Sequence, residues 1–347
     1  MQWVRRSASF AESARFICSI GLLAVLFAFT PIRAQAEIAA VPQRLAAALE
    51  AVQPDPLPAQ LAADAHFVVS DEGAHWLFRE AVSGLGGALI GVGTDPNYLL
   101  AGWARPEVLI LLDFDQVVVD VHAVYRVVFL NSPDPESFLR AWAADRKDDV
   151  ERWIAAAHPD PTRRQQVLRA YRMARNLIAW RLQGLRKAYR AQKVATFLDD
   201  AAQYAHLRDL FQAGRVFAIR GDLTGRSAVR GVAAALKDAG IPVRVLYLSN
   251  AEKYFDCTQD YRANMRALSM DDRTVVLRTA GGWDPEVAPD GLYTYLVQPG
   301  PVFQAWMQEG VPCSFKAIVS RRKLDKNRNG LGTLTASPPA PRPKTRR

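Results

Sequence analysis

The sequence has few of the side chains that proteins use to hold metals. Its 347 residues include only three Cys and five His. The histidines, His66, His75, His122, His158 and His206, are scattered without a ligand spacing, and no Cys-x-x-Cys pair occurs. Structural and catalytic metal sites use closely spaced Cys and His ligands. The sequence therefore predicts no metal site.

Motifs of two large enzyme classes are also missing. No Gly-x-Ser-x-Gly stretch is present to place a serine nucleophile on a sharp turn, so nothing supports a hydrolase. No Gly-x-x-x-x-Gly-Lys loop is present to hold the phosphates of a nucleoside triphosphate. No internal repeat is visible. The function must be sought in other features.

One apolar run, "ICSIGLLAVLFAF" at 17–29, lies near the N-terminus. It follows Arg5, Arg6 and Arg15 and is followed by Ala34 and Ala36, the small residues of a cleavage site. This pattern predicts a signal peptide over 1–36 and export to the periplasm or the medium. An uncleaved anchor is the alternative, but the run is shorter than the ~20 residues that span a bilayer. The Arg pair leaves both the general and the twin-arginine export routes open.

The cysteines of the mature chain form an even pair. Cys18 lies in the apolar run and is lost with the signal peptide, which leaves Cys257 and Cys313. In an oxidising compartment such a pair favours a disulfide. Two separate buried thiols are the alternative, because sequence separation says nothing about distance.

The formal net charge of +9 is unevenly distributed. Residues 1–36 carry +3 and residues 320–347 carry +8, so the body over 37–319 is close to neutral at −2. The basic segment 320–347 has too few apolar residues to form a core, and we expect a disordered tail that contacts anionic surfaces. Specific nucleic-acid binding is not expected.

The body has the alternation of an α/β protein. An Ala/Pro-rich linker with one helix is expected over 37–64 and a folded domain over 65–319. Six apolar segments predict strands, at 88–93, 107–115, 215–222, 242–250, 273–280 and 292–300. Helical patterns lie between them, the clearest at 225–240 with Gly240 at its end. The pattern predicts a Rossmann-like three-layer sandwich with a mostly parallel sheet.

The alternation is interrupted over about 135–212, where the sequence looks helical throughout. Leu168, Tyr171, Leu177, Ile178 and Leu182 form an amphipathic helical pattern among many arginines. We expect an inserted helical segment that packs on the domain, rather than a membrane or nucleic-acid helix.

A candidate ligand site lies in "GVGTDPNYLL" at 91–100. Gly91 and Gly93 end the first strand, Asp95 and Asn97 lie in the turn that follows, and Asp113 ends the second strand. An acid about twenty residues after a glycine loop accepts hydrogen bonds from ribose hydroxyls in dinucleotide sites. A plain turn with a solvated Asp113 is the alternative.

Other polar residues also follow strands. Asp222 is a candidate ligand-binding residue or a helix cap. Asn250 and Glu252 follow the fourth strand, at the sheet edge where ligands of such folds gather. His122 and Tyr125 share a helix face with apolar residues, which favours a core histidine over a catalytic base.

The chain resembles class I methyltransferase-like Rossmann proteins. It is more similar to an uncharacterised bacterial family that carries "GVG-D-NY-L", "RP", "LLDF" or "LDY", and "SN-E-Y", found here at 91–100, 105–106, 111–114 and 249–254. This resemblance implies a methyltransferase-like fold without an established activity, and it is the only ground for S-adenosylmethionine as a candidate cofactor. Asp95 stands at the position of the third glycine of the loops of working enzymes. The candidate ligand-binding residues are Gly91, Gly93, Asp95, Asn97, Tyr98, Asp113, Asp222, Asn250 and Glu252.

Two functions remain open from the sequence. The first is an exported protein that binds a small polar or nucleoside-like ligand, with or without transferase activity. The second is a non-enzymatic envelope or secreted module that has lost cofactor binding. An open pocket at the ends of the strands favours the first, and a space filled by side chains favours the second.

Overall fold

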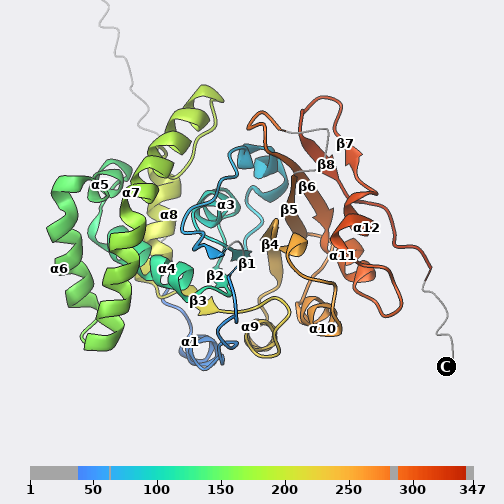
Figure 1. The fold of residues 1–347 in the computed structure, drawn as a ribbon, viewed down its shortest axis with the longest axis horizontal. Coiled ribbons are helices and arrows are strands. Elements are labelled where there is room, and N and C mark those ends of the chain that lie inside the picture. Colours follow the sequence, from blue (N-terminus) through green and yellow to red (C-terminus); the bar gives the residue numbers. More distant parts are fainter. Residues whose placement is uncertain (1–37, 62–63, 282–287, 341–347) are drawn as a thin grey trace, which may run out of the picture. The chain divides into compact units, whose positions relative to one another are not determined.

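Among the residues that the computed structural model describes, 38–61, 64–281 and 288–340, eight strands form a single sheet. Their order across the sheet is β3-β2-β1-β4-β5-β6-β8-β7 (Figure 1). The bounds are β1 Ala88–Val92, β2 Val108–Asp113, β3 Val216–Arg220, β4 Val243–Ser249, β5 Val275–Gly281, β6 Tyr293–Pro299, β7 Lys323–Leu324 and β8 Leu331–Thr333. The six strands expected from the sequence correspond to β1 to β6.

Neighbouring strands from β3 to β5 are parallel, and β6 is antiparallel to β5. The chain adds β2 and β3 on one side of β1 and then crosses to β4 on the other side. The order therefore reverses between β1 and β4. In open α/β sheets this reversal leaves a crevice at the carboxyl ends of the strands.

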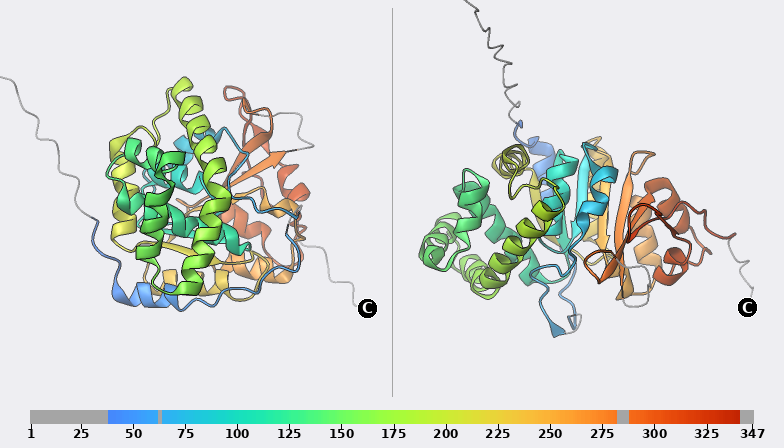
Figure 2. Two further views of the ribbon diagram at one scale, coloured as in Figure 1. Left: turned by 60° about the vertical axis from the view of Figure 1, so that its left-hand side comes forward. Right: turned by 90° about the horizontal axis from the view of Figure 1, so that it is seen from above.

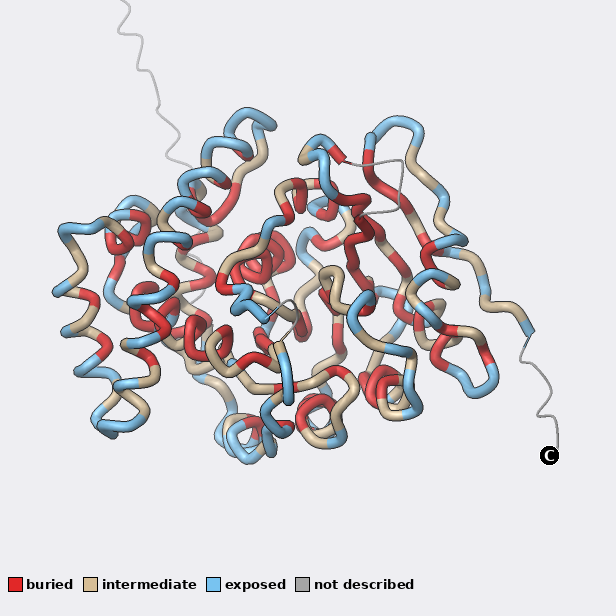
Figure 3. Tube along the Cα trace, viewed as in Figure 1, coloured by how far each residue is buried: buried red, intermediate tan, exposed pale blue. Residues whose placement is uncertain are grey.

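Helices cover both faces of the sheet because the strands bury side chains on both faces. Leu109 and Leu111 of β2 belong to one hydrophobic core, and Ile110 and Leu112 belong to the other. The first core is covered by η2 His75–Phe78, α2 Arg79–Val82, α3 Pro96–Ala104, α4 Gln116–Asn131, α5 Pro135–Ala141, α6 Lys147–Ala157, α7 Pro161–Ala191 and α8 Ala201–Gln212. The second is covered by α1 Gln43–Glu50, α9 Ala228–Asp238, α10 Gln259–Ala267, α11 Gly300–Trp306 and α12 Phe315–Val319. Buried residues follow the strands and the inner sides of the helices (Figure 3). The Rossmann-like three-layer prediction is confirmed.

The helical segment at 135–212 forms α5 to α8, with the short η3 Ala144–Arg146 between α5 and α6. Its helices, mostly green, gather beside the strands (Figure 2). Tyr171, Ile178 and Leu182 of α7 are buried in the first core. In the part of the chain that the structure describes, no helix has the length and apolar character needed to cross a membrane.

The segment expected as a linker over 37–64 is folded where it is described. Leu45 and Leu49 of α1 are buried in the second core, where α1 contacts α9. The Asp55 carboxylate, 2% exposed, accepts hydrogen bonds from the backbone N–H groups of Asp222, Arg226 and Ser227. The one helix expected in this segment is present as α1, but the segment packs on the domain, because one face of α1 has a partner that Ala and Pro content does not show.

The disordered-tail prediction for 320–347 was wrong over most of its length. β7 and β8 extend the sheet beyond β6, with Leu331 beside Tyr295. Leu331 and Leu334 are buried. These apolar residues complete the edge of the core. The prediction missed them because it used the average composition of the segment, which is dominated by basic residues. Residues 341–347 lie outside the described residues, as does the expected signal peptide at 1–36.

Cys257 and Cys313 form a disulfide with their Cα atoms 5.9 Å apart. It joins the segment before α10 to the segment before α12 across 56 residues of sequence. A crosslink over a loop of this length constrains the unfolded chain and stabilises the fold.

Candidate functional site

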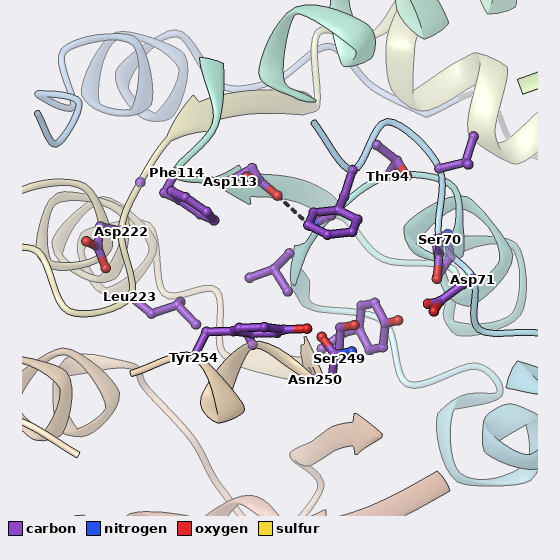
Figure 4. A pocket seen from close by; sticks show the side chains of 18 of the residues that line it. Ser70, Asp71, Thr94, Asp113, Phe114, Asp222, Leu223, Ser249, Asn250 and Tyr254 are labelled. Carbon is purple, nitrogen blue, oxygen red and sulfur yellow. Dashed lines mark hydrogen bonds between the residues drawn. The ribbon is translucent and has the colours of Figure 1, made fainter. Parts of the chain in front are cut away.

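A cavity of about 210 Å³ opens at the carboxyl ends of the parallel strands, where the strand order reverses. Asp113 and Phe114 lie across it from Ser249, Asn250 and Tyr254, with Asp222 at one end and Asp71 at the other (Figure 4). Its lining comprises Phe67, Val69, Ser70, Asp71, Val92, Gly93, Thr94, Pro96, Asp113, Phe114, Gly221, Asp222, Leu223, Tyr247, Ser249, Asn250, Ala251, Tyr254, Phe255 and Tyr293.

Asp113 ends β2 with its carboxylate at the cavity. One oxygen, Oδ2, accepts a hydrogen bond of 3.2 Å from the Gly93 N–H, and Oδ1 accepts one of 2.9 Å from the Asp115 N–H. Burial raises the pKa of Asp113 to about 7. The Asp115 carboxylate adds to this rise, while the two N–H donors oppose it. Asp113 is therefore a partly protonated acid at neutral pH.

The two glycines of the first loop have different roles. Gly93 lines the cavity with φ +74°, a conformation that favours glycine. Gly91 does not line it. A Cβ on Gly91 would lie 1.8 Å from Oδ1 of Asn97, whose amide donates to the carbonyls of Val92, Gly93 and Thr94. Gly91 and Asn97 thus shape the loop and do not face the cavity.

Asp95 is fully buried and turned away from the cavity. It accepts hydrogen bonds from Arg181 Nε of α7, at 2.8 Å, and from the Ser70 N–H, at 2.9 Å. This carboxylate joins the glycine loop to the helical segment and to the strap of chain before η2. Its role is structural.

Tyr98 is also a buried structural residue. Its hydroxyl donates to Nδ1 of His122 at 2.8 Å, and Nε2 of His122 donates to the Gly93 carbonyl at 2.8 Å. Burial lowers the pKa of His122 to about 4, so the ring is neutral. The structure places His122 in the core, where it supports the loop.

Of the residues beyond the first loop, Asp222 and Asn250 line the cavity and Glu252 does not. Asp222 Oδ1 accepts hydrogen bonds from the N–H and hydroxyl of Thr224, both at 2.7 Å. Glu252 is buried, lies 2.6 Å from Arg278 Nε and accepts a hydrogen bond from the Tyr261 hydroxyl. The structure therefore brings Gly93, Asp113, Asp222 and Asn250 together at the cavity and places Gly91, Asp95, Asn97, Tyr98 and Glu252 behind its wall.

A network around Glu72 supports the cavity and was not expected from the sequence. The carboxylate of Glu72 is 1% exposed and accepts hydrogen bonds from Ser249 Oγ at 2.5 Å, Thr279 Oγ1 at 2.6 Å and His75 Nε2 at 2.8 Å, and from the Tyr247 hydroxyl. It ties the strap at 66–74 to β4 and β5. Its local pattern, "SDEGAH", indicated only the start of a helix.

The strap at 66–74 supplies four lining residues and is held at several points. His66 Nδ1 lies 2.7 Å from Asp115 Oδ2, and the Tyr293 hydroxyl donates to Asp71 at 2.8 Å. Among the described residues, no group of three or more His, Cys, Asp or Glu side chains is placed to hold a metal ion. The site is thus an acidic, aromatic cavity with fixed walls.

Comparison with known proteins gives a family but no function. No curated protein matches the sequence. The family described as a domain of unknown function, DUF7790, matches residues 67–335, which include all of the cavity-lining residues. Because this match covers more than half of the sequence, the chain belongs to the DUF7790 family.

Proposed function

We propose that the strand-end cavity binds a small nucleoside-like ligand whose vicinal hydroxyls donate hydrogen bonds to Asp113. The carboxyl group of Asp113 carries the proposal. It ends a parallel strand beside the reversal of strand order, where ligands of open α/β folds bind. A carboxylate in such a place is costly to ionise, and two hydroxyl donors offset that cost.

The size and lining of the cavity support a small ligand. The cavity has a volume of about 210 Å³ and lies at the strand ends, where small ligands of open α/β folds bind. Phe114 follows Asp113 directly, and Tyr254 lies across the cavity from it (Figure 4). Aromatic side chains in this position suit the faces of a planar base, because offset stacking is favourable.

We further propose that the fold is methyltransferase-like. The order β3-β2-β1-β4-β5 and the sites at Gly93, Asp113 and Asn250 support this relation. S-adenosylmethionine itself fits in part: Asp113 suits its ribose hydroxyls, but no Lys or Arg of the described part of the chain lines the cavity to pair with its carboxylate. The residues present do not fit the complete cofactor, and we derive no methyl transfer.

The alternative function, a secreted module that has lost ligand binding, predicts that side chains fill the space at the strand ends. The open cavity favours ligand binding over this alternative. We assign no catalytic residue, because His122 is buried and neutral and Asp113 has no nucleophile or second acid within its hydrogen bonds.

Asp113→Asn is expected to weaken adenosine binding by about 1.5–3 kcal/mol, the range for hydrogen bonds to a charged group. The melting temperature should change little, because asparagine loses one of the two backbone hydrogen bonds of Asp113 but also removes a carboxyl group whose ionisation burial disfavours. Isothermal titration calorimetry with adenosine, together with thermal unfolding, measures both effects.

Asp238→Asn is the matched control. Asp238 lies exposed at the end of α9 farthest from the cavity, so this variant should bind adenosine like the wild type. Failure of the wild type to bind adenosine or any other nucleoside, or equal binding by Asp113→Asn, would refute the proposal.

We also propose that the protein is exported and that the mature chain begins near Glu37. The disulfide between Cys257 and Cys313 supports an oxidising compartment. Mass spectrometry of the protein from cell fractions should find a chain that starts near Glu37 outside the cytoplasm. A cytoplasmic protein that retains Met1 would contradict export.

A further inference from the structure

We infer that the cavity selects a nucleoside-like ligand that carries a positive charge and rejects the matching anion. This inference rests on the proposed function and defines the charge of its ligand. Three features support it: the charges of the lining, its aromatic surface, and the hydrogen bonds that nearby backbone N–H groups already donate to carboxylates of the protein.

The lining carries negative charge without a balancing cation. Asp71, Asp113 and Asp222 all line the cavity, and among the described residues no Lys, Arg or His does. The nearest cationic side chains in the sequence are engaged elsewhere. Arg220 binds the Asp55 carbonyl and Gln116, and Lys253 points to the Gly281 carbonyl. A cleft lined by charges of one sign concentrates ligands of the opposite sign.

Aromatic side chains form much of the remaining surface. Phe67 and Tyr254 are 53% and 59% exposed, high values for such large side chains, and both line the cavity. Phe114, Tyr247, Phe255 and Tyr293 line it as well. Aromatic faces attract organic cations through their quadrupole, so they add to the preference that the carboxylates set.

Anionic ligands of Rossmann-like folds bind backbone N–H groups at strand-to-helix loops. Here the protein's own carboxylates accept hydrogen bonds from several of these donors. The Gly93 and Asp115 N–H groups donate to Asp113. In the loop before α9, the N–H groups of Asp222, Arg226 and Ser227 donate to Asp55. A phosphate would have to displace these carboxylates and would meet the charges of the lining.

The protonation of Asp113 provides a second measure of the ligand's charge. Its surroundings are acidic on several sides: Asp115 on its own loop, Asp71 on the strap and Asp222 after β3, with His66 paired to Asp115 and Arg220 engaged as described. A cation in the cavity favours ionised Asp113 and lowers its pKa from about 7. Binding of a cation at pH 7 should therefore release part of a proton.

Three ligands with the same nucleoside test the inference: adenosine, 5′-amino-5′-deoxyadenosine and adenosine 5′-monophosphate. Calorimetry at pH 7 in two buffers of different ionisation enthalpy gives affinity and proton release. We expect the ammonium compound to bind at least ten-fold more tightly than adenosine, with proton release, and the phosphate to bind at least ten-fold more weakly.

Asp222→Asn separates charge from shape, because asparagine keeps the acceptor for Thr224. It should reduce the affinity for the ammonium compound more than that for adenosine, whereas the Asp238→Asn control should change neither. Equal binding of ammonium compound and adenosine, or tighter binding of the phosphate, would overturn the charge preference and leave the proposed function standing. No binding of any of the three would refute both.

Discussion

Asp95→Ala is expected to lower the free energy of unfolding by about 3–5 kcal/mol, the usual cost of removing one partner from a buried ion pair. The side chain of Asp95 is fully buried and that of Arg181 is 10% exposed. Without Asp95, the guanidinium of Arg181 remains buried without its carboxylate, and the Ser70 N–H loses its acceptor. Denaturant unfolding at pH 7 measures the change.

The double variant Asp95→Ala/Arg181→Met distinguishes this explanation from a simple loss of packing. The double variant no longer contains the buried, unpaired guanidinium of Arg181. It should therefore be at least as stable as Asp95→Ala alone, which is a clear departure from additivity. If the unfolding free energy of Asp95→Ala lies within about 1 kcal/mol of the wild-type value, the ion pair is as weak as pairs exposed to solvent. That result would contradict the structural role assigned to Asp95.

Glu72→Ala is expected to cost a similar amount, about 3–5 kcal/mol, because it leaves several buried donors without an acceptor. Burial acts to raise the pKa of Glu72, but the hydrogen bond and charge of His75 and the hydroxyls of Ser249 and Thr279 outweigh it and hold the pKa below 4.5. The folded protein therefore stabilises the ionised form of the Glu72 carboxylate.

The sign of this pKa shift makes the effect dependent on pH. A lowered pKa in the folded state stabilises the protein above about pH 4.5, and the contribution is lost as the pH falls through the folded-state pKa. The difference in unfolding free energy between the wild type and Glu72→Gln should therefore shrink between pH 6 and pH 3. A difference that stays constant over this range would show that the charge of Glu72 contributes nothing.

The strands and the edge that carries the site could be predicted from local patterns. Each of β1 to β6 is a short apolar run bounded by turn residues, and the ends of parallel strands meet at one edge. Gly93 and Asn250 directly follow strands, Asp113 is the last residue of one, and Asp222 lies two residues after another, so their place at the cavity follows from the strand pattern of the sequence.

Five of the candidate residues do not line the cavity, and for Asp95 and Glu252 the reason is a partner distant in sequence or on another element. Asp95 is bound by Arg181, 86 residues away, and Glu252 by Arg278 on the neighbouring strand. No local pattern shows which carboxylate faces a ligand and which faces an arginine. For the same reason Glu72, whose partners lie on β4 and β5, was not identified as a support of the cavity.

The most direct test of the account is a crystal structure of the protein with 5′-amino-5′-deoxyadenosine at saturating concentration. The account predicts density between Phe114 and Tyr254, with the ribose hydroxyls within hydrogen-bond distance of Asp113 and the ammonium group facing the carboxylates of the lining. A ligand bound elsewhere on the protein, or a cavity that holds only water under these conditions, would contradict it.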